Sequence, residues 1–293
     1  VIGAASAGVR VMTSSSSPGI SLKSEGMSYL AGCDLPALVV NVQRGGPGLG
    51  GIQPSQSDYF QATKALGHGD YKRLVLAPAS VQEMASLTYQ AFALADKYRM
   101  TAMILADGTI GQMMEPVALD FPEPEKMEKP WAVVGTGGRR RPNIINSLCL
   151  QPEELESQNI ARFKRYETVE RCEVRSESYR MEDAEVCAVA FGVCARVARN
   201  AVDAARAQGV KAGLIRPVTL WPFPKQALKD AAVNCKAFVS VEMSMGQMVE
   251  DVELAIRCAR PVYTCTRVGG MIPDPDQVTR ALLDANRAGG ETA

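Results

Sequence analysis

Asn41-Val-Gln-Arg-Gly-Gly-Pro-Gly-Leu-Gly-Gly-Ile-Gln-Pro-Ser-Gln-Ser-Asp-Tyr-Phe60 is the stretch that decides how this chain folds. The apolar run at residues 37–42 predicts a buried strand that leads into it, and residues 59–66 can begin a helix. The glycines between them let the backbone approach a bound group, and Arg44 offers a planar set of donors suited to a carboxylate or phosphate. We interpret the stretch as a binding loop at a strand end; the alternative is a flexible surface turn.

The same order of strand, loop and helix continues on both sides of this loop. Strands are predicted at residues 10–13, 73–77 and 101–106, and helices at 20–32 and 81–98. Ser80, with Glu83 three residues later, predicts the start of the last of these helices. Apolar rather than alternating strands are typical of a parallel sheet covered on both faces, so residues 1–115 are predicted to form a doubly wound α/β domain.

The composition changes after residue 115. Residues 116–181 are rich in proline and then in charge, which predicts an extended linker with a short strand at 131–134 and a polar helix near 153–177. A second α/β pattern follows, with strands at 185–191, 210–216, 237–242 and 262–267 and a rigid aromatic turn at 217–224. The chain is therefore predicted to hold two doubly wound α/β domains joined by a linker.

Charge and composition exclude several classes of protein. The chain has 293 residues with 32 Lys and Arg against 32 Asp and Glu, and its one basic cluster, residues 139–141, precedes a proline. This favours neither nucleic acid nor an anionic membrane as a partner. No apolar run approaches the roughly 20 residues that cross a bilayer, and no signal-peptide pattern is present, so we predict a cytoplasmic protein.

Metal ligands are not predicted on this chain. The eight cysteines contain no Cys-x-x-Cys pair, and most lie in apolar patterns, which indicates reduced core thiols rather than a zinc or iron-sulfur site. The sequence begins with Val1 rather than Met, and we expect an N-terminal part to be missing.

The nucleotide-binding motifs common in α/β proteins are absent. There is no GxxxxGK[ST], and no GxGxxG opens a helix after the first strand, which argues against an NTPase or an NAD enzyme. The serine tract at 14–17 is either a linker or a site for a polar ring or phosphate. His68, the only histidine, is either a structural hydrogen bonder or a site residue, and no nucleophile pattern supports a triad around it. These residues alone predict an anion bound through Arg44 and do not name the reaction.

Ordered motifs give the chain a resemblance to a known family. Residues 13–22, 41–58, 67–70, 76–83, 107–116, 215–224 and 242–251 resemble the α subunit of 2-oxoacid:ferredoxin oxidoreductases over nearly the whole chain. Gly-Pro-Gly-Leu-Gly-Gly-Ile-Gln-Pro-Ser-Gln at 46–56 is most similar to the branched-chain (3-methyl-2-oxobutanoate, or 2-ketoisovalerate) branch. The 2-oxoglutarate and pyruvate branches are the alternatives.

The resemblance implies oxidative decarboxylation of a 2-oxoacid to acyl-CoA and CO₂ with reduction of ferredoxin. Residues 1–115 would be a thiamine diphosphate pyrimidine-binding domain lacking its N-terminal part, 116–181 a linker and connecting helix, and 182–293 a transketolase C-terminal-like domain. The diphosphate and Mg²⁺ would be held mainly by a β subunit, and [4Fe-4S] clusters by a ferredoxin-like subunit of the same hetero-oligomer. Coenzyme A would be the co-substrate.

The resemblance also implies site residues. Arg44 matches the arginine that receives the substrate carboxylate, and His68 is the second catalytic candidate. Gln53 and Gln56 would join Arg44 at the substrate. The residues expected to line the cofactor are Thr13, Ser14, Ser15, Ser16, Ser17, Gly45 and Gly46. The family's Tyr-Pro-Ile-Thr turn and activating glutamate should precede Val1, so a non-catalytic α/β binding or assembly module is the alternative hypothesis.

Overall fold

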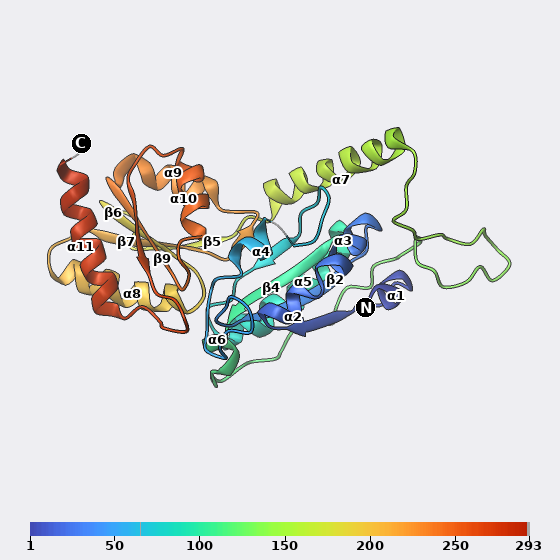
Figure 1. Ribbon diagram of the computed structural model, residues 1–293, viewed down its shortest axis with the longest axis horizontal. Helices are drawn as coiled ribbons and strands as arrows, with labels where there is room; N and C mark the ends of the chain where they lie inside the picture. Colours follow the sequence, from blue (N-terminus) through green and yellow to red (C-terminus); the bar gives the residue numbers. More distant parts are fainter. Residues whose placement is uncertain (65, 292–293) are drawn as a thin grey trace.

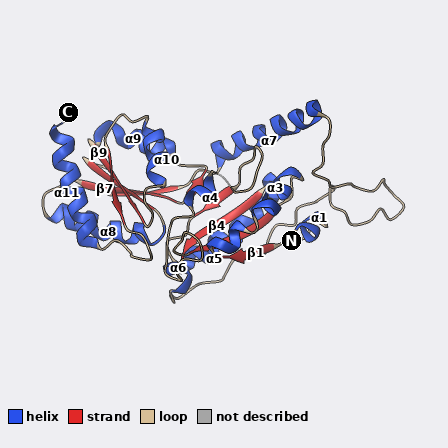
Figure 2. Cartoon of the chain, in the orientation of Figure 1, coloured by secondary structure: helices blue, strands red, loops and turns tan. Residues whose placement is uncertain are grey.

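Two five-stranded sheets form the centre of the computed structural model, which describes residues 1–64 and 66–291 (Figures 1 and 2). The first sheet has the strand order β1-β2-β4-β3-β8, and the second has the order β10-β9-β6-β7-β5. The doubly wound α/β arrangement predicted from the apolar strands is therefore present in both halves of the chain.

The first sheet is built around β2 and β4. Both strands are apolar and buried at almost every position, and they pair in parallel from Ala37 opposite Thr101 to Gln43 opposite Asp107. The helix α5 begins as predicted, because the Ser80 hydroxyl accepts a hydrogen bond from the Glu83 backbone N–H at 3.1 Å. The elements of this part are α1 (Ile2–Ser6), β1 (Met12–Ser15), α2 (Ser17–Ser21), α3 (Ser24–Gly32), β2 (Ala37–Gln43), α4 (Tyr59–Thr63), β3 (Leu74–Leu76), α5 (Val81–Tyr98), β4 (Thr101–Asp107) and α6 (Gly108–Gln112).

The second sheet has β6 at its centre. This strand is fully buried and pairs in parallel with β7 on one side and β9 on the other, while α8 and α11 pack together on one face. The elements of this part are α7 (Pro152–Cys172), β5 (Ser176–Tyr179), β6 (Val186–Ala190), α8 (Gly192–Ala207), β7 (Ala212–Pro217), β8 (Thr219–Trp221), α9 (Lys225–Asn234), β9 (Ala237–Glu242), α10 (Met248–Ile256), β10 (Val262–Thr266) and α11 (Pro275–Glu291).

Each sheet also carries an antiparallel edge strand that the sequence did not indicate. The prediction of a rigid turn at 217–224 was wrong, because β8 lies there and pairs with β3 of the first sheet. The polar helix was predicted to reach residue 177, but it ends at Cys172, and β5 follows and pairs with β7. The strand β8, from the second half of the chain, therefore forms the edge of the first sheet. The domain boundaries predicted at residues 115 and 181 stay predictions.

Three smaller expectations need correction. Residues 131–134 form a turn instead of a strand, with the Val133 N–H bonded to the Ser6 carbonyl at 2.8 Å. The helix predicted at 20–32 is two helices, α2 and α3. Of the cysteines interpreted as core thiols, Cys187, Cys194 and Cys235 are buried, whereas Cys172 and Cys258 are exposed. Within residues 1–64 and 66–291, no helix is both long and apolar enough to cross a membrane.

A buried polar contact joins the two sheets at the start of α8. Asp107, at the end of β4, is almost fully buried and accepts a hydrogen bond from the Val193 N–H at 2.9 Å. The Gln56 side chain donates to the Phe191 carbonyl at 2.9 Å. Gly192 lies between these partners with φ of +57°. A Cβ atom at Gly192 would lie 2.5 Å from Asp107 Oδ2 and 2.9 Å from Gln56 Nε2.

Substitution of Gly192 is therefore expected to weaken the contact between the sheets. We predict that Gly192→Ala lowers the free energy of unfolding by about 3 kcal/mol, through left-handed backbone strain and displacement of the Asp107 carboxylate. Urea denaturation measures the loss. Gly209→Ala at the other end of α8 is the control, because Gly209 has φ of +86° and open space around its Cα. Equal losses in the two variants would contradict the proposed crowding at Gly192.

Candidate functional site

A cleft of about 880 Å³ lies between the two sheets, among the loops that follow β1, β2, β9 and β10. These are the carboxyl ends of parallel strands, where α/β proteins bind their ligands. We call it the inter-sheet cleft. Its lining residues are Ser17, Pro18, Ser21, Gly46, Pro47, Gly48, Ser55, Ser57, Asp58, Gln61, Met243, Ser244, Met245, Gln247, Val268 and Gly269.

The glycine-rich loop after β2 is closed by its own hydrogen bonds. The Gly45 N–H donates to the Gln53 carbonyl at 2.9 Å, and the Gly51 N–H donates to the Gly45 carbonyl at 2.9 Å. Gly50 adopts φ of +56°, and a Cβ there would lie 1.9 Å from the Gly45 oxygen. Only glycine allows the backbone to fold back this closely. The loop therefore has a defined, hydrogen-bonded conformation, and the flexible-turn interpretation is not supported.

The Arg44 side chain forms hydrogen bonds with the backbone of this loop. Its Nε donates to the Ser16 hydroxyl at 3.2 Å, and its Nη1 donates to the carbonyls of Leu49 and Gly51, the latter at 3.0 Å. Three of the five guanidinium donors are thereby engaged. Nη2 has no hydrogen-bond partner among the described residues. Arg44 is half-buried and is not among the residues that line the inter-sheet cleft. A two-pronged contact with a carboxylate requires either the loop carbonyls to release Nη1 or Ser16 to release Nε.

Two residues of the serine tract at 14–17, Ser16 and Ser17, form hydrogen bonds with Arg44, and only Ser17 also lines the cleft. The Ser17 hydroxyl bonds both the N–H and the carbonyl of Arg44 at 3.1 Å. The Ser14 carbonyl accepts a hydrogen bond from Lys23 at 2.9 Å, and Ser15 packs against Gly19. Of the residues predicted to line the cofactor, the structure places Ser17 and Gly46 at the cleft. The other predicted cofactor residues do not line the cleft and lie in β1 or the loops that follow β1 and β2: Thr13, Ser14, Ser15, Ser16 and Gly45.

The two glutamines predicted at the substrate have different environments. Gln56 is fully buried, and its Oε1 accepts a hydrogen bond from the Met243 N–H at 3.1 Å, so both ends of its amide are held by the second half of the chain. Gln56 thus sets the position of the cleft wall. Gln53 is exposed on the glycine-rich loop and packs against Gly270.

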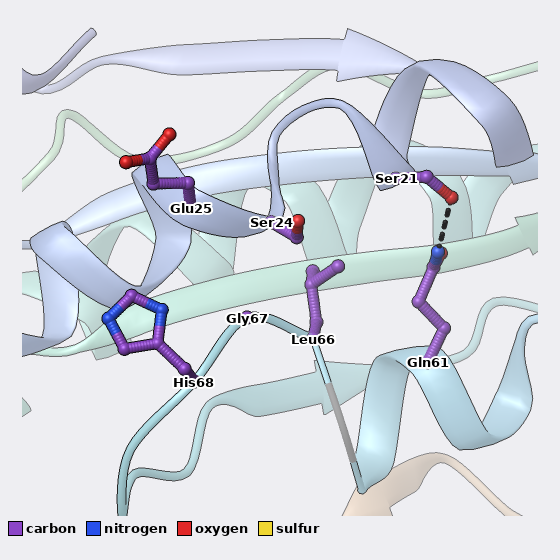
Figure 3. Close-up of a pocket in the computed structure, with 7 residues that line it drawn as sticks. All are labelled: Ser21, Ser24, Glu25, Gln61, Leu66, Gly67 and His68. Atoms are coloured by element: carbon purple, nitrogen blue, oxygen red, sulfur yellow. Dashed lines mark hydrogen bonds between the residues drawn. The ribbon is translucent and has the colours of Figure 1, made fainter.

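His68 lies outside the inter-sheet cleft. It is exposed in a shallow pocket of about 400 Å³ that is also lined by Ser24 and Glu25 of α3 (Figure 3). The Gln61 amide donates to the Ser21 hydroxyl at 2.9 Å, and both residues line this pocket and the cleft. The Tyr29 ring makes an edge contact with the His68 ring at 6.4 Å between centroids. His68 therefore lies in a pocket separate from the inter-sheet cleft.

Glu242 is a buried residue that the sequence reasoning missed, and it directly precedes Met243 and Ser244 of the cleft lining. It ends β9 fully buried, and its carboxylate accepts hydrogen bonds from the Ser240 and Ser244 hydroxyls at 2.8 and 2.7 Å. It also accepts from three backbone N–H groups at the start of α10, those of Gln247, Met248 and Val249. A buried carboxylate is stabilised by such donors at a helix start. The sequence signal that could have identified Glu242 is an acidic residue placed between an apolar strand and a helix.

Asp58 is the second missed residue, and it supplies a carboxylate to the cleft. The Asn41 amide donates to Asp58 Oδ2 at 2.9 Å, and the Asp58 N–H donates to Gln43 Oε1 at 3.0 Å. Asn41 and Gln43 are buried polar side chains in the otherwise apolar strand β2. Polar residues inside a buried strand were therefore the sequence signal for this site.

Tyr59, next to Asp58, fixes α4 against α10. Its hydroxyl donates to Asp251 Oδ2 at 2.6 Å. Burial, and then the neighbouring Asp251 carboxylate, raises the pKa of Tyr59 well above its ordinary value. The phenol consequently stays protonated and is a hydrogen-bond donor at all ordinary pH values. Among the described residues, no group of three or more His, Cys, Asp or Glu side chains is arranged to hold a metal ion.

Comparison with known proteins gives two adjoining family matches. The family model described as "Pyruvate flavodoxin/ferredoxin oxidoreductase, thiamine diP-bdg" matches residues 1–183. A second, described as "Pyruvate:ferredoxin oxidoreductase core domain II", matches residues 184–278. The two matches agree with the predicted fold class, a thiamine-binding domain followed by a second α/β domain.

The individual relatives that match the chain are also named as 2-oxoacid oxidoreductases or synthases. The chain is 50% identical over 287 residues, 97% of its length and 80% of the relative's, to a protein of Methanothermobacter marburgensis named "Ketoisovalerate oxidoreductase subunit VorB". It is 33% identical over 98% of its length and 83% of the relative's to "2-oxoglutarate synthase subunit KorA" of Methanothermobacter thermautotrophicus. A solved 2-oxoglutarate:ferredoxin oxidoreductase from Magnetococcus marinus, with 2-oxoglutarate, coenzyme A and succinyl-CoA bound, matches with a TM-score of 0.81 at 25% identity. That match covers 98% of this chain and 55% of the solved chain.

Proposed function

Because the chain belongs to the pyruvate flavodoxin/ferredoxin oxidoreductase family, we propose that it is the α subunit of an enzyme that oxidises a branched-chain 2-oxoacid. The proposed reaction is the CoA-dependent oxidative decarboxylation of 3-methyl-2-oxobutanoate to acyl-CoA and CO₂, with the electrons passed to ferredoxin. The observation that carries the choice of substrate is the 50% identity to a ketoisovalerate oxidoreductase subunit, against 33% to a 2-oxoglutarate synthase subunit.

The lining of the inter-sheet cleft supports the same choice. Met243, Met245 and Val268 offer apolar surface for a branched side chain. Of the described residues that line the cleft, none is Lys or Arg, and Asp58 contributes a negative charge. A second carboxylate, as in 2-oxoglutarate, would enter without a cation to balance it.

The cleft also fits part of thiamine diphosphate. Gly46 and Gly48 leave open backbone beside the hydroxyls of Ser17, Ser55 and Ser57, which suits a flat polar ring. When bound, thiamine diphosphate supplies the electron sink for decarboxylation. This chain would hold the ring and exclude water with the loop that Glu242 anchors. Arg44, which lies outside the cleft lining, would orient the substrate carboxylate once its loop releases the guanidinium. The diphosphate with its Mg²⁺ is assigned to a β subunit, since the cleft lining supplies no cation.

The remaining partners follow from the same proposal. Electron transfer to ferredoxin needs [4Fe-4S] clusters, which we assign to a ferredoxin-like subunit of the complex, and coenzyme A is the acyl acceptor. His68 is retained as a second candidate at the edge of the site, reached through the shared wall of Ser21 and Gln61. The cytoplasmic location stays a prediction.

A substrate panel tests the proposal. With the partner subunits present, we expect kcat/KM for 3-methyl-2-oxobutanoate to exceed that for 2-oxoglutarate by at least about tenfold, because of the uncompensated second carboxylate. The rates are followed as CoA-dependent reduction of a low-potential acceptor. A preference for 2-oxoglutarate or pyruvate would overturn the substrate, and no turnover with any 2-oxoacid would favour the non-catalytic module.

A further inference from the structure

The tip of the glycine-rich loop, residues 46–52, is held by few contacts, and we call it the loop tip. Every residue in it is exposed. In the part of the chain that the structure describes, the loop tip takes part in three hydrogen bonds, two of which come from Arg44 Nη1 to the carbonyls of Leu49 and Gly51. The third joins the Gly51 N–H to the Gly45 carbonyl at 2.9 Å. Arg44 is therefore the main contact that keeps the loop tip in its observed position.

The chain that follows the loop tip is fixed to the second half of the molecule. The Gln56 N–H donates to the Met243 carbonyl at 3.0 Å. The Gln247 side chain donates to the Ser57 carbonyl and accepts a hydrogen bond from the Phe60 N–H, both at 2.8 Å. The loop tip can therefore move while the cleft wall that begins behind it stays in place, and its glycines give the backbone the freedom to do so.

The loop tip carries two large apolar side chains. Leu49 and Ile52 are 84% and 78% exposed, and neither lines the inter-sheet cleft in the observed conformation. On the side of the cleft that the second half supplies, Met245 and Val268 are 82% and 45% exposed and do line it, together with residues 46–48. An extended chain advances by roughly 3.4 Å per residue, so the middle of the loop tip can move by about 10 Å between fixed ends. Apolar side chains on the two sides of the cleft can thus meet and leave water.

The Arg44 guanidinium can bind either the loop carbonyls or an anion, and the anion is the stronger acceptor. A hydrogen bond to an ionised carboxylate is roughly twice as strong as one to a neutral carbonyl. The carbonyls of Leu49 and Gly51 belong to the exposed loop tip, whereas Ser16, which accepts from Nε, is half-buried. A carboxylate therefore approaches from the side of the loop tip, where it takes Nη1 and Nη2 together and displaces both carbonyls. This exchange removes two of the three hydrogen bonds of the loop tip.

We propose that the loop tip is a lid, which the carboxylate of the substrate releases from Arg44 and which then closes over the inter-sheet cleft, with Leu49 and Ile52 packed against the apolar lining. Closure excludes water from the bound acid. In the proposed reaction the carboxylate leaves as CO₂, so Arg44 regains the loop carbonyls and the lid reopens for coenzyme A. The inference rests on the proposed function for the identity of the acid, but it does not require turnover.

Cysteine cross-linking in the assembled complex tests the lid. The double variant L49C/M245C places one thiol on the loop tip and one on the opposite side of the cleft, and a short bifunctional thiol reagent is added under anoxic conditions. The probe is 3-methyl-2-oxobutanoate, and thiamine diphosphate is withheld so that the acid keeps its carboxylate. We expect the acid to speed cross-linking by at least about tenfold, because it shifts the population of the loop tip to the closed state. Mass spectrometry identifies the cross-linked peptides.

Two further variants separate the lid from a general effect of the acid. When R44M is added to the pair, the loop tip loses its main contact, so cross-linking is expected to be fast both with and without the acid. The matched control is L49C/L254C, because Leu254 is also exposed, at 66%, but does not line the cleft. We expect this control to cross-link slowly under both conditions.

The outcomes distinguish the lid from the proposed reaction. The lid is overturned if the acid leaves the cross-linking rate of L49C/M245C unchanged, or if it speeds cross-linking equally in the R44M background. A complex that turns over while cross-linking stays slow under every condition also overturns the lid, since a partner subunit would then cover Leu49. Cross-linking that responds to the acid in a complex without turnover would support the lid and contradict the proposed function.

Discussion

Replacing Arg44 with methionine is expected to raise KM for the 2-oxoacid by on the order of a hundredfold, because a charge-assisted hydrogen bond to the substrate carboxylate is lost. Arg44→Lys keeps the charge but cannot reproduce the planar donors that hold Ser16 and the Gly51 carbonyl, and we expect an intermediate value. Steady-state kinetics of the reconstituted complex over a range of substrate concentrations measures both effects.

Arg44 also closes its own loop, so a control must separate the two roles. Gly50→Ala disturbs the return of the loop without removing the guanidinium, since the added Cβ would overlap the Gly45 carbonyl. If KM reports the carboxylate contact, Arg44→Met should affect KM for the 2-oxoacid far more than KM for coenzyme A. A parallel rise of both constants in Arg44→Met and Gly50→Ala would mean that Arg44 acts only by shaping the loop.

Glu242→Ala is expected to lower the free energy of unfolding by about 4 kcal/mol, the largest stability loss that we predict for a single residue. The substitution leaves the Ser240 and Ser244 hydroxyls and three backbone N–H groups at the start of α10 without their acceptor. Thermal unfolding followed by circular dichroism should show a fall in Tm of about 10 °C.

Glu250→Ala is the matched control for this variant. Glu250 lies in the first turn of the same helix but is exposed, so its removal should change stability by no more than about 0.5 kcal/mol. Similar losses in the two variants would show that the effect belongs to the helix dipole in general and not to the buried acceptor at Glu242.

Much of the fold was predictable because its central strands are long and apolar. The strand pair β2 and β4 and the helix α5 were placed within about a residue of their observed ends, since burial on both faces and a Ser80 cap leave clear patterns. The strands β8 and β5 were missed for opposite reasons. β8 has three residues among prolines and resembles a turn, while β5 is polar and half exposed at a sheet edge.

The site was predictable only in part. Arg44 and its glycines stand out because their chemistry is local to one loop. The role of Gln56 depends on Phe191 and Met243, and that of Glu242 on the start of α10, so neither follows from spacing within one motif. His68 was singled out because it is the only histidine, yet its pocket is separate from the cleft. The positions of these side chains relative to the cleft depend on packing between segments that are far apart in the sequence.

The most direct test of the central claim is the reaction itself. The complex of this chain with the proposed β and cluster-bearing subunits is supplied with thiamine diphosphate, Mg²⁺, coenzyme A and ferredoxin, and 3-methyl-2-oxobutanoate is added. We predict equal amounts of acyl-CoA and CO₂, formed only when every subunit, coenzyme A and ferredoxin are present. Formation of acyl-CoA at the same rate without this chain, or its absence from the complete mixture, would contradict the assignment.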